Sequence, residues 1–240
     1  MQEILKRCGE WLQKQVNNAK ADGIVLGLSG GIDSAVLAIL GIKFLGRENV
    51  LCLKMPCHSN PEDEADADLL IKKFNIKNKK IDLTQAFDSI LSEFKSQNEI
   101  ITRESQSNLK ARLRMSTLYA YAQTHNFLVC GTSNKSEYLT GYFTKFGDSG
   151  VDLMPLADFL KRDIRKLAVI LEIPEKIIKK APSAGLYQGQ TDENDMGFTY
   201  EVLDNYLEKG EIINADVKQK IDAMKLRSEH KRQPIPIFKI

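Results

Sequence analysis

The sequence lacks the features that mark several specialised classes of protein. Its 34 Lys and Arg against 32 Asp and Glu leave a net charge of +2, without the basic excess expected of a chain built to bind nucleic acid. No apolar run reaches the ~18–20 residues of a membrane span. The nearest candidate, 24–42, is interrupted by Asp33 and by two adjacent glycines. We therefore expect a soluble protein with neither a nucleic-acid partner nor a membrane partner.

Signals for secretion and for disulfide bonding are also missing. The N-terminal segment is amphipathic and mixed in charge, with neither the apolar stretch nor the cleavage site of a signal peptide. The four cysteines, Cys8, Cys52, Cys57 and Cys130, form no CxxC pair and no Cys/His metal spacing. Buried, reduced thiols in a cytoplasmic protein are the favoured interpretation.

The sequence does contain a regular alternation of short apolar runs and longer amphipathic segments. This alternation predicts an α/β fold with a doubly wound, mostly parallel, Rossmann-like sheet and helices on both faces. A length of 240 residues suits one large domain over 1–240. Strands are expected at 24–29, 49–56, 77–84 and 127–134, and helices at 3–20, 33–46, 61–74, 85–95, 108–126, 160–173, 199–208 and 214–229.

Two stretches are expected to be loops. Residues 96–107 are polar. Residues 182–197 are rich in Gly, Gln and acidic side chains, which predicts a mobile loop with little to bury. Because parallel sheets bind ligands beyond the carboxyl ends of their strands, the segments that follow the strands are the places to look for a site.

The segment after the first strand has the chemistry of a phosphate cradle. Adjacent glycines let a ligand approach the backbone, the helix start offers free N–H groups, and two serines add hydroxyls. A Gly-rich turn with an N-capping Asp is the structural alternative. The segment matches neither a Walker A loop nor GxGxxG. The predicted cradle comprises Gly27, Leu28, Ser29, Gly30, Gly31, Ile32, Asp33 and Ser34.

An acidic residue in this cradle requires an explanation. The Asp33 carboxylate would repel a phosphate, and a divalent cation between the two removes the conflict. Mg²⁺ is the natural candidate, since it prefers a few carboxylates together with phosphate oxygens. Glu137, a few residues beyond the fourth strand, could join it as a second oxygen ligand, although the residues alone also suit a solvated Glu.

These motifs resemble a known family. SGGxDS at 29–34 is similar to the pyrophosphate loop of the ATP pyrophosphatases, which include NAD, GMP and asparagine synthetases. The runs at 131–148, 108–119, 182–193 and 230–232 closely resemble the NAD synthetase family, in order and over nearly the whole chain. The resemblance implies amidation of nicotinic acid adenine dinucleotide (deamido-NAD) to NAD, the last step of NAD biosynthesis. ATP would adenylate the carboxylate with release of pyrophosphate, and ammonia would then displace AMP.

The resemblance also implies roles for individual residues. It implies that Asp33 and Glu137 bind Mg²⁺ and are catalytic. ATP would be contacted by the cradle together with Thr132, Lys161 and Ser183, and deamido-NAD by Arg112, Lys145, Asp152, His230 and Lys231.

Read without the resemblance, most of these residues have ordinary interpretations. Thr132 could belong to a plain turn, and Arg112, Lys145 and Asp152 could be surface charges. His230 and its basic neighbours could simply favour a helix C-terminus. Lys161 carries a signal of its own, because a cation at the start of a helix opposes the helix dipole.

The family resemblance further implies a homodimer with substrate sites at the subunit interface, through the 108–126 helix. The length leaves no segment for the glutamine-hydrolysing domain of larger NAD synthetases, so we expect free ammonia to be the nitrogen donor. Two alternatives stay open at this point. One is a different amidating or thiolating relative, such as a GMP synthetase-like domain. The other is a non-catalytic nucleotide-binding module, which gives no reason for acids at both Asp33 and Glu137.

Overall fold

The computed structural model describes residues 1–185, 187, 189–210 and 214–239. In that part of the chain the strands form a parallel sheet in the order β3-β2-β1-β4. Ile24 of the central strand β1 pairs with Val50 on one side and Leu128 on the other. The strands are β1 (Gly23–Gly27), β2 (Val50–Lys54), β3 (Asn78–Lys80) and β4 (Phe127–Val129), which confirms the predicted sheet.

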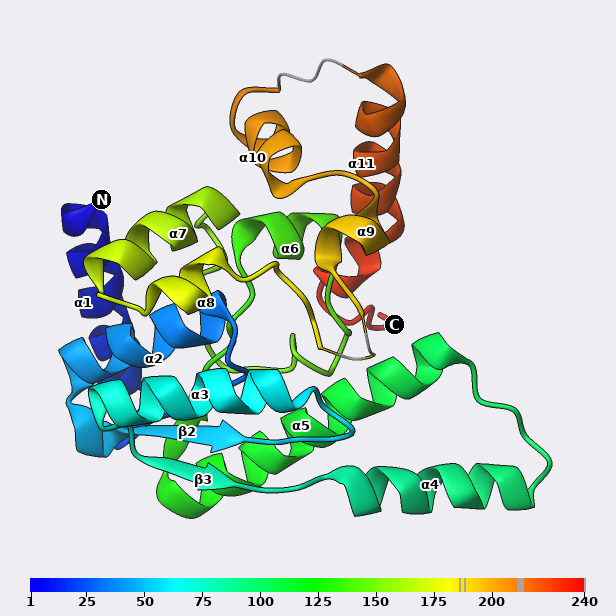
Figure 1. Ribbon diagram of the computed structural model, residues 1–240, viewed down its shortest axis with the longest axis horizontal. Helices are drawn as coiled ribbons and strands as arrows, with labels where there is room; N and C mark the ends of the chain where they lie inside the picture. The colour runs from blue at the N-terminus through cyan, green and yellow to red at the C-terminus, as the bar shows by residue number, and fades with distance from the viewer. Residues whose placement is uncertain (186, 188, 211–213, 240) are drawn as a thin grey trace.

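Helices cover both faces of this sheet because the central strands β1 and β2 are apolar on both sides. Along β1, Ile24 and Leu26 face one core, whereas Val25 faces another. Figure 1 shows α1, α2, α7 and α8 gathered on one side of the strands. The first core packs under α1 (Gln2–Asn18), α2 (Ile32–Leu45), α3 (Pro61–Phe74), α7 (Lys161–Ile170) and α8 (Glu175–Lys179), and the second under α4 (Thr84–Ser96) and α5 (Arg103–His125).

A third cluster is built by the C-terminal part of the chain. Its buried members are Met196, Phe198, Tyr200, Leu203 and Ile221. The helices of this part are α6 (Lys135–Thr140), α9 (Asp192–Met196), α10 (Tyr200–Lys209) and α11 (Ala215–Arg227). There are also two short 3-10 helices, η1 (Arg47–Asn49) before β2 and η2 (Glu229–Lys231) after α11.

Some predicted boundaries are wrong. Helix α5 begins at Arg103 instead of 108, because the Thr102 hydroxyl accepts a hydrogen bond from Ser105 N at 3.2 Å and caps an earlier turn. The short helices α6 and α8 were not predicted. Both are at most six residues long, too short to show a helical period in the sequence.

The prediction that 182–197 has little to bury is also wrong for part of that segment. Gln190, Asp192 and Met196 are buried, and Asp192 N donates to Pro182 O at 2.9 Å. The ring of Tyr187 lies under the guanidinium of Arg103, 3.5 Å from it. The described residues of the segment therefore fold back against the body of the protein, while 186 and 188 lie outside the described residues.

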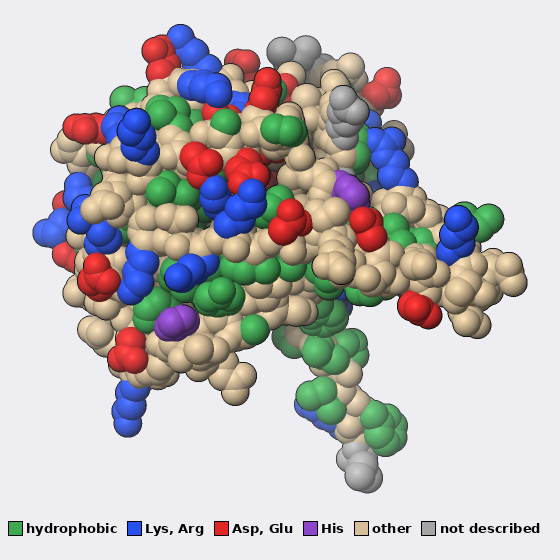
Figure 2. All heavy atoms as spheres, turned by 60° about the horizontal axis from the view of Figure 1, so that its bottom comes forward, with side chains coloured by type: hydrophobic (Ala, Val, Ile, Leu, Met, Phe, Trp, Pro, Cys, Tyr) green, Lys and Arg blue, Asp and Glu red, His purple; other side chains and the backbone are tan. Residues whose placement is uncertain are grey.

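The C-terminal segment projects away from the molecule. Figure 2 shows hydrophobic side chains along an extended tail, and Ile235, Ile237 and Phe238 are 66%, 80% and 90% exposed. No helix in the described ranges is long and apolar enough to cross a bilayer.

Candidate active site

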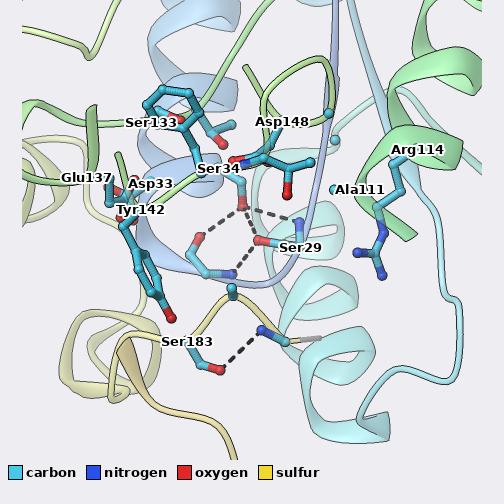
Figure 3. Close-up of a pocket in the computed structure, with 18 of the residues that line it drawn as sticks. Ser29, Asp33, Ser34, Ala111, Arg114, Ser133, Glu137, Tyr142, Asp148 and Ser183 are labelled. Carbon is cyan, nitrogen blue, oxygen red and sulfur yellow. Dashed lines mark hydrogen bonds between the residues drawn. The ribbon is translucent and has the colours of Figure 1, made fainter. Parts of the chain in front are cut away.

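A cavity of about 1150 Å³ opens at the carboxyl ends of the strands, where the parallel sheet predicts it. Its wall is formed by the β1–α2 loop, the segments after β2 and β4, one face of α5, described residues between 180 and 195, and the segment 224–231. Figure 3 shows the side chains that line it.

The β1–α2 loop is braced by its two serines. Ser34 Oγ donates to Gly31 O at 2.9 Å and accepts from Ser29 N at 3.2 Å, and Ser29 Oγ accepts from Gly31 N at 3.2 Å. Gly30 has a φ of +79°, and a Cβ there would overlap the carbonyl oxygen of Asp63 on α3. No described side chain caps the start of α2, so the N–H groups of its first turn stay available for an anion.

Two carboxylates meet beside this loop, on a buried lysine. Lys161 Nζ lies 2.6 Å from Asp33 Oδ2 and 3.1 Å from Glu137 Oε1. The lysine side chain is 2% exposed, whereas those of Asp33 and Glu137 are 16% and 14% exposed. Residues 128 positions apart thus form one charged cluster at the cavity wall.

Asn134, which is fully buried, holds both carboxylates in place. Its Nδ2 donates to Asp33 Oδ1 at 2.8 Å. Its Oδ1 accepts from Glu137 N at 3.1 Å, and its own N donates to Glu137 Oε2 at 3.2 Å. The last two bonds form a capping box at the start of α6. Our sequence reasoning missed Asn134, although an N-x-x-E pattern after a strand is a readable capping signal.

The start of α7 accommodates Lys161 through partners on other elements. Ser136 Oγ accepts from Lys161 N at 3.2 Å, and Asp204 Oδ2 accepts from Arg162 N at 2.8 Å. Ser136 Oγ in turn donates to Asp204 Oδ1 at 2.6 Å. The buried carboxylate of Asp204 therefore interacts favourably with the positive end of the α7 dipole. No local sequence signal predicts this contact, because Asp204 comes from α10.

Burial sets the protonation of the cluster. It raises the pKa of Glu137 to about 7, a shift that Lys161 opposes and that repulsion from Asp33 reinforces. Burial alone would lower the pKa of Lys161, but attraction to Asp33 and Glu137 outweighs it and the pKa is raised. The raised pKa keeps Lys161 in its ammonium form at neutral pH.

A further acid lies behind this cluster. Tyr200 OH donates to Asp192 Oδ2 at 2.9 Å and lies 3.3 Å from Glu137 Oε1. Burial raises the pKa of Asp192, with opposition from Lys161. Asp192 lies within the family-like run 182–193 but carries no local signal that marks it as a site residue, and Tyr200 lies outside the runs that resemble the family.

The donor set fits a magnesium ion. Among the described residues, no group of three or more His, Cys, Asp and Glu is placed to hold a metal alone. Mg²⁺ needs no such group, since it usually takes one or two carboxylates, substrate phosphates and water. Asp33 and Glu137 stand beside the phosphate cradle, and the ammonium of Lys161 already shows that a cation fits between them.

Several other predicted residues lie on the cavity wall. Thr132, Ser183, His230 and Lys231 all line it, with Lys161 and every cradle residue except Gly30. Lys231 Nζ donates to the carbonyl oxygens of Gly141 and Phe143, each at 2.8 Å.

Three predicted substrate residues lie outside this wall. Arg112 is exposed, and its Nη2 donates to Lys145 O at 3.3 Å. Lys145 Nζ donates to His230 O at 2.8 Å. The Asp152 carboxylate accepts from Tyr119 OH at 3.0 Å and from Val129 N at 2.8 Å.

Another arginine of the same helix faces the cavity. Arg114 lines it, and its Nε donates to Met55 O at 3.1 Å while Nη2 lies 3.3 Å from Ser59 Oγ. Figure 3 shows Arg114 with Tyr142 and Asp148, which our sequence reasoning also missed. Two positions along a helix turn a side chain to a different face, so the choice between Arg112 and Arg114 needed the orientation of α5.

Comparison with known proteins gives a consistent picture. The model of the NAD synthase family matches residues 4–235. An ammonia-dependent NAD synthetase from Finegoldia magna is 48% identical over 93% of this chain and 90% of its own. The fold is similar to an NMN synthetase from Francisella tularensis, with a TM-score of 0.93, 39% identity and coverage of 100% and 98% of the two chains. It is also similar to an ammonia-dependent NAD synthetase from Campylobacter jejuni, with a TM-score of 0.81, 33% identity and coverage of 99% and 98%.

Proposed function

The chain belongs to the NAD synthase family, and we propose that the cavity at the carboxyl ends of its strands is where it carries out the family's reaction. The protein is a carbon–nitrogen ligase that converts deamido-NAD to NAD with ATP and ammonia. One observation supports placing the chemistry here: the phosphate cradle, the Asp33–Glu137 pair and the ammonium of Lys161 converge on one cavity.

The residues suit an adenylation mechanism. A carboxylate is a poor electrophile, and transfer of AMP to the nicotinate carboxylate creates a carbonyl that ammonia can attack. The cradle N–H groups, Lys161 and Ser183 hold the ATP phosphates, so catalysis consists mainly of positioning and charge stabilisation. Asp33 and Glu137 would hold Mg²⁺, which when bound neutralises part of the polyphosphate charge.

The described residues between Pro182 and Met196 protect the reaction from water. They line the cavity through Ser183, Gln190 and Asp192, and Tyr187 packs on Arg103. An acyl adenylate hydrolyses if water reaches it, and a covering segment prevents that loss.

The nicotinate nucleotide is proposed to bind near His230 and Lys231. Arg112, Lys145 and Asp152 remain proposed contacts to the same substrate. Their position outside the cavity wall suits a homodimer in which a second copy completes the substrate site.

Replacing Asp33 tests the site directly. Asp33→Asn should fold like the wild type and lose NAD formation by about 100-fold or more, because an amide is a weaker metal ligand and cannot balance Lys161. The measurement is ATP-dependent NAD formation together with pyrophosphate release, with circular dichroism as the fold control. Asp158→Asn is the matched control, because Asp158 is 93% exposed and pairs only with Lys135 at 2.8 Å among the contacts described. Unchanged turnover in Asp33→Asn would contradict the assignment.

A second candidate acceptor is nicotinate mononucleotide. The similarity to the Francisella tularensis protein, named an NMN synthetase, favours testing it. Both acceptors share the nicotinate ribose phosphate, and they differ only in the AMP half, which Arg112, Lys145 and Asp152 are proposed to meet. Values of kcat/KM for deamido-NAD and the mononucleotide, with xanthosine monophosphate as negative control, decide between them.

The same assay tests the nitrogen donor. Ammonium chloride should support full turnover and glutamine essentially none, because the curated relatives at 41–48% identity are ammonia-dependent enzymes. Turnover with glutamine by the purified chain, at an ammonia concentration too low to sustain it, would contradict this prediction.

A further inference from the structure

We propose that Lys161 is an internal counter-ion: in the nucleotide-free protein its ammonium occupies the cation position between Asp33 and Glu137, so that a divalent metal binds only together with the nucleotide polyphosphate. The inference rests on the proposed function in one respect, since it takes Asp33 and Glu137 to be the metal ligands. It adds a binding order to that function: the nucleotide displaces the Lys161 ammonium, and the metal then binds Asp33 and Glu137.

Every oxygen of the two carboxylates already has a partner in the protein. Lys161 Nζ contacts Asp33 Oδ2 at 2.6 Å and Glu137 Oε1 at 3.1 Å. Asn134 occupies the other two oxygens, through Nδ2 to Asp33 Oδ1 at 2.8 Å and through its backbone N to Glu137 Oε2 at 3.2 Å. A carboxylate oxygen that accepts one hydrogen bond can still ligate a metal, so Asn134, which is neutral and fixed by the cap of α6, is no obstacle. The obstacle is the positive charge of the Lys161 ammonium, which lies between the two carboxylates.

Lys161 is the donor that can move. Its backbone is held at the start of α7, but its ammonium sits at the end of a flexible four-carbon stem. The ammonium lies at the cavity, 4.9 Å from the centre of the Tyr200 ring. The Lys161 side chain is only 2% exposed, so water cannot solvate its charge. If the ammonium leaves the two carboxylates, it must pair with another anion.

Charge then decides the order of binding. With Lys161 in place, its positive charge already balances the negative charge of Asp33 at 2.6 Å, and Glu137 lies 3.1 Å from the same ammonium. A divalent ion brought to the same oxygens meets the ammonium within a few ångströms in a poorly screened site, where repulsion between cations is strong. ATP brings several phosphate charges to the adjacent cradle. Once the ammonium pairs with a phosphate, both carboxylates are released for the metal.

Manganese binding without catalysis tests this order. Mn²⁺ serves as the probe, followed by electron paramagnetic resonance, with and without a non-hydrolysable ATP analogue. Without the analogue, the wild type should bind Mn²⁺ with a Kd weaker than ~1 mM. Lys161→Met should bind Mn²⁺ alone at least ~tenfold more tightly than the wild type, because the competing charge is gone.

The control variant is Lys135→Met. Lys135 lies on α6 and pairs with the exposed Asp158 at 2.8 Å, so its loss should leave Mn²⁺ binding unchanged. If the wild type and Lys161→Met bind Mn²⁺ equally well without nucleotide, the counter-ion role is overturned.

A wild-type measurement covers the case in which Lys161→Met does not fold. Gel filtration in Mn²⁺ should leave metal on the wild type only when the ATP analogue is present. Metal retained without the analogue, and lost in Asp33→Asn, would overturn the proposal and leave the proposed function intact. Analogue-dependent retention that Asp33→Asn does not reduce would instead overturn the metal ligands assigned in the proposed function.

Discussion

The carboxylate of Glu137 both caps a helix and contacts the lysine of the charged cluster. Its Oε2 closes the capping box at the start of α6, while its Oε1 faces Lys161. The structural bond fixes the orientation of the functional oxygen, so the rotamer is set before any ligand arrives. This is why a residue that reads as a solvated Glu in the sequence lies instead in a charged cluster.

Glu137→Gln should change how stability depends on pH. Burial raises the pKa of Glu137 to about 7, well above the ordinary value near 4.5, so its contribution to stability is full below pH ~4.5 and declines as pH rises through 7. Glutamine does not titrate. In thermal unfolding without nucleotide or metal, the Tm of the variant relative to the wild type should therefore increase from pH 5 to 8.

Glu201→Gln provides the comparison. Glu201 is exposed on α10, and its Tm difference from the wild type should stay constant over the same range. A constant difference for Glu137→Gln as well would contradict the raised pKa.

At this scale, local sequence predicts some site residues and not others. Asp33 and the cradle are recognisable because the loop, its glycines and its serines are contiguous. Ser183 follows only from the family resemblance, whereas Glu137 and Lys161 have weak local signals, a place after a strand end and a place at a helix start, to which the resemblance gives a role. Their convergence depends on how three separate strand and helix ends are placed, which no local pattern encodes.

Helix α7 is held by elements distant in sequence. Its N-cap residue, Leu160, offers no side-chain hydrogen bond, and Ser136 and Asp204 supply the acceptors instead. Because the first residue of α7 is Lys161, this arrangement also fixes where the ammonium enters the cavity. The buried carboxylate of Asp204 therefore links the packing of α10 against α7 to the position of Lys161 in the site.

Removing that carboxylate should destabilise the protein. Asp204→Ala leaves the Arg162 N–H and the Ser136 hydroxyl without an acceptor in a buried place, at a cost of about 2–4 kcal/mol. Urea unfolding measures the loss. Glu201→Ala, in the first turn of the same helix as Asp204, should cost less than ~1 kcal/mol. Equal losses in the two variants would rule out a capping role for Asp204.

The reliability of sequence-based prediction varies between elements for physical reasons. Strands buried on both faces are continuous apolar runs, and β1 and β2 lie at such runs. β4 is also apolar and lies at a predicted strand, although two of its three residues are half-buried. Helices α6 and α8 depend on caps and packing, because they are too short for a period. The segment around α9 folds because Met196 reaches a core built by later helices, which its own composition does not reveal.

For the whole molecule, the fold class and the edge of the sheet that carries the site are predictable. Alternating strands and helices imply the parallel sheet, and the sheet implies a cavity at its carboxyl edge. The other wall of that cavity is not predictable in this way, since it comes from 180–195 and 224–231. Those residues reach the cavity only through tertiary packing. Arg114 and Asp192 lie within runs that resemble the family, but nothing local marks either one as a site residue, and Tyr200 lies outside those runs.

The quaternary prediction belongs to the same scale. The side chains of Ile235, Ile237 and Phe238 are exposed and close together in the chain. Exposed apolar residues on an ordinary surface are scattered singly, whereas a contiguous group of them marks an interaction site. We expect a second copy of the chain to cover them, in addition to the contact through the 108–126 helix that the family resemblance implies. Sedimentation equilibrium should give a mass about twice the 27.1 kDa of one chain.

Replacing all three tail residues with serine should weaken dimer formation by ~tenfold or more. Each large apolar side chain that is fully covered in the dimer contributes about 1.5–3 kcal/mol of binding free energy, and serine removes that contribution. Thermal unfolding of the monomer should change little, since these side chains are mostly exposed within one chain. Val169→Ser, an isolated residue that is 64% exposed on α7, is the matched control and should leave the dimer intact. If the triple variant remains as dimeric as the wild type, the tail lies outside the interface; if the wild type turns over normally as a monomer, the dimer is not needed to complete the substrate site.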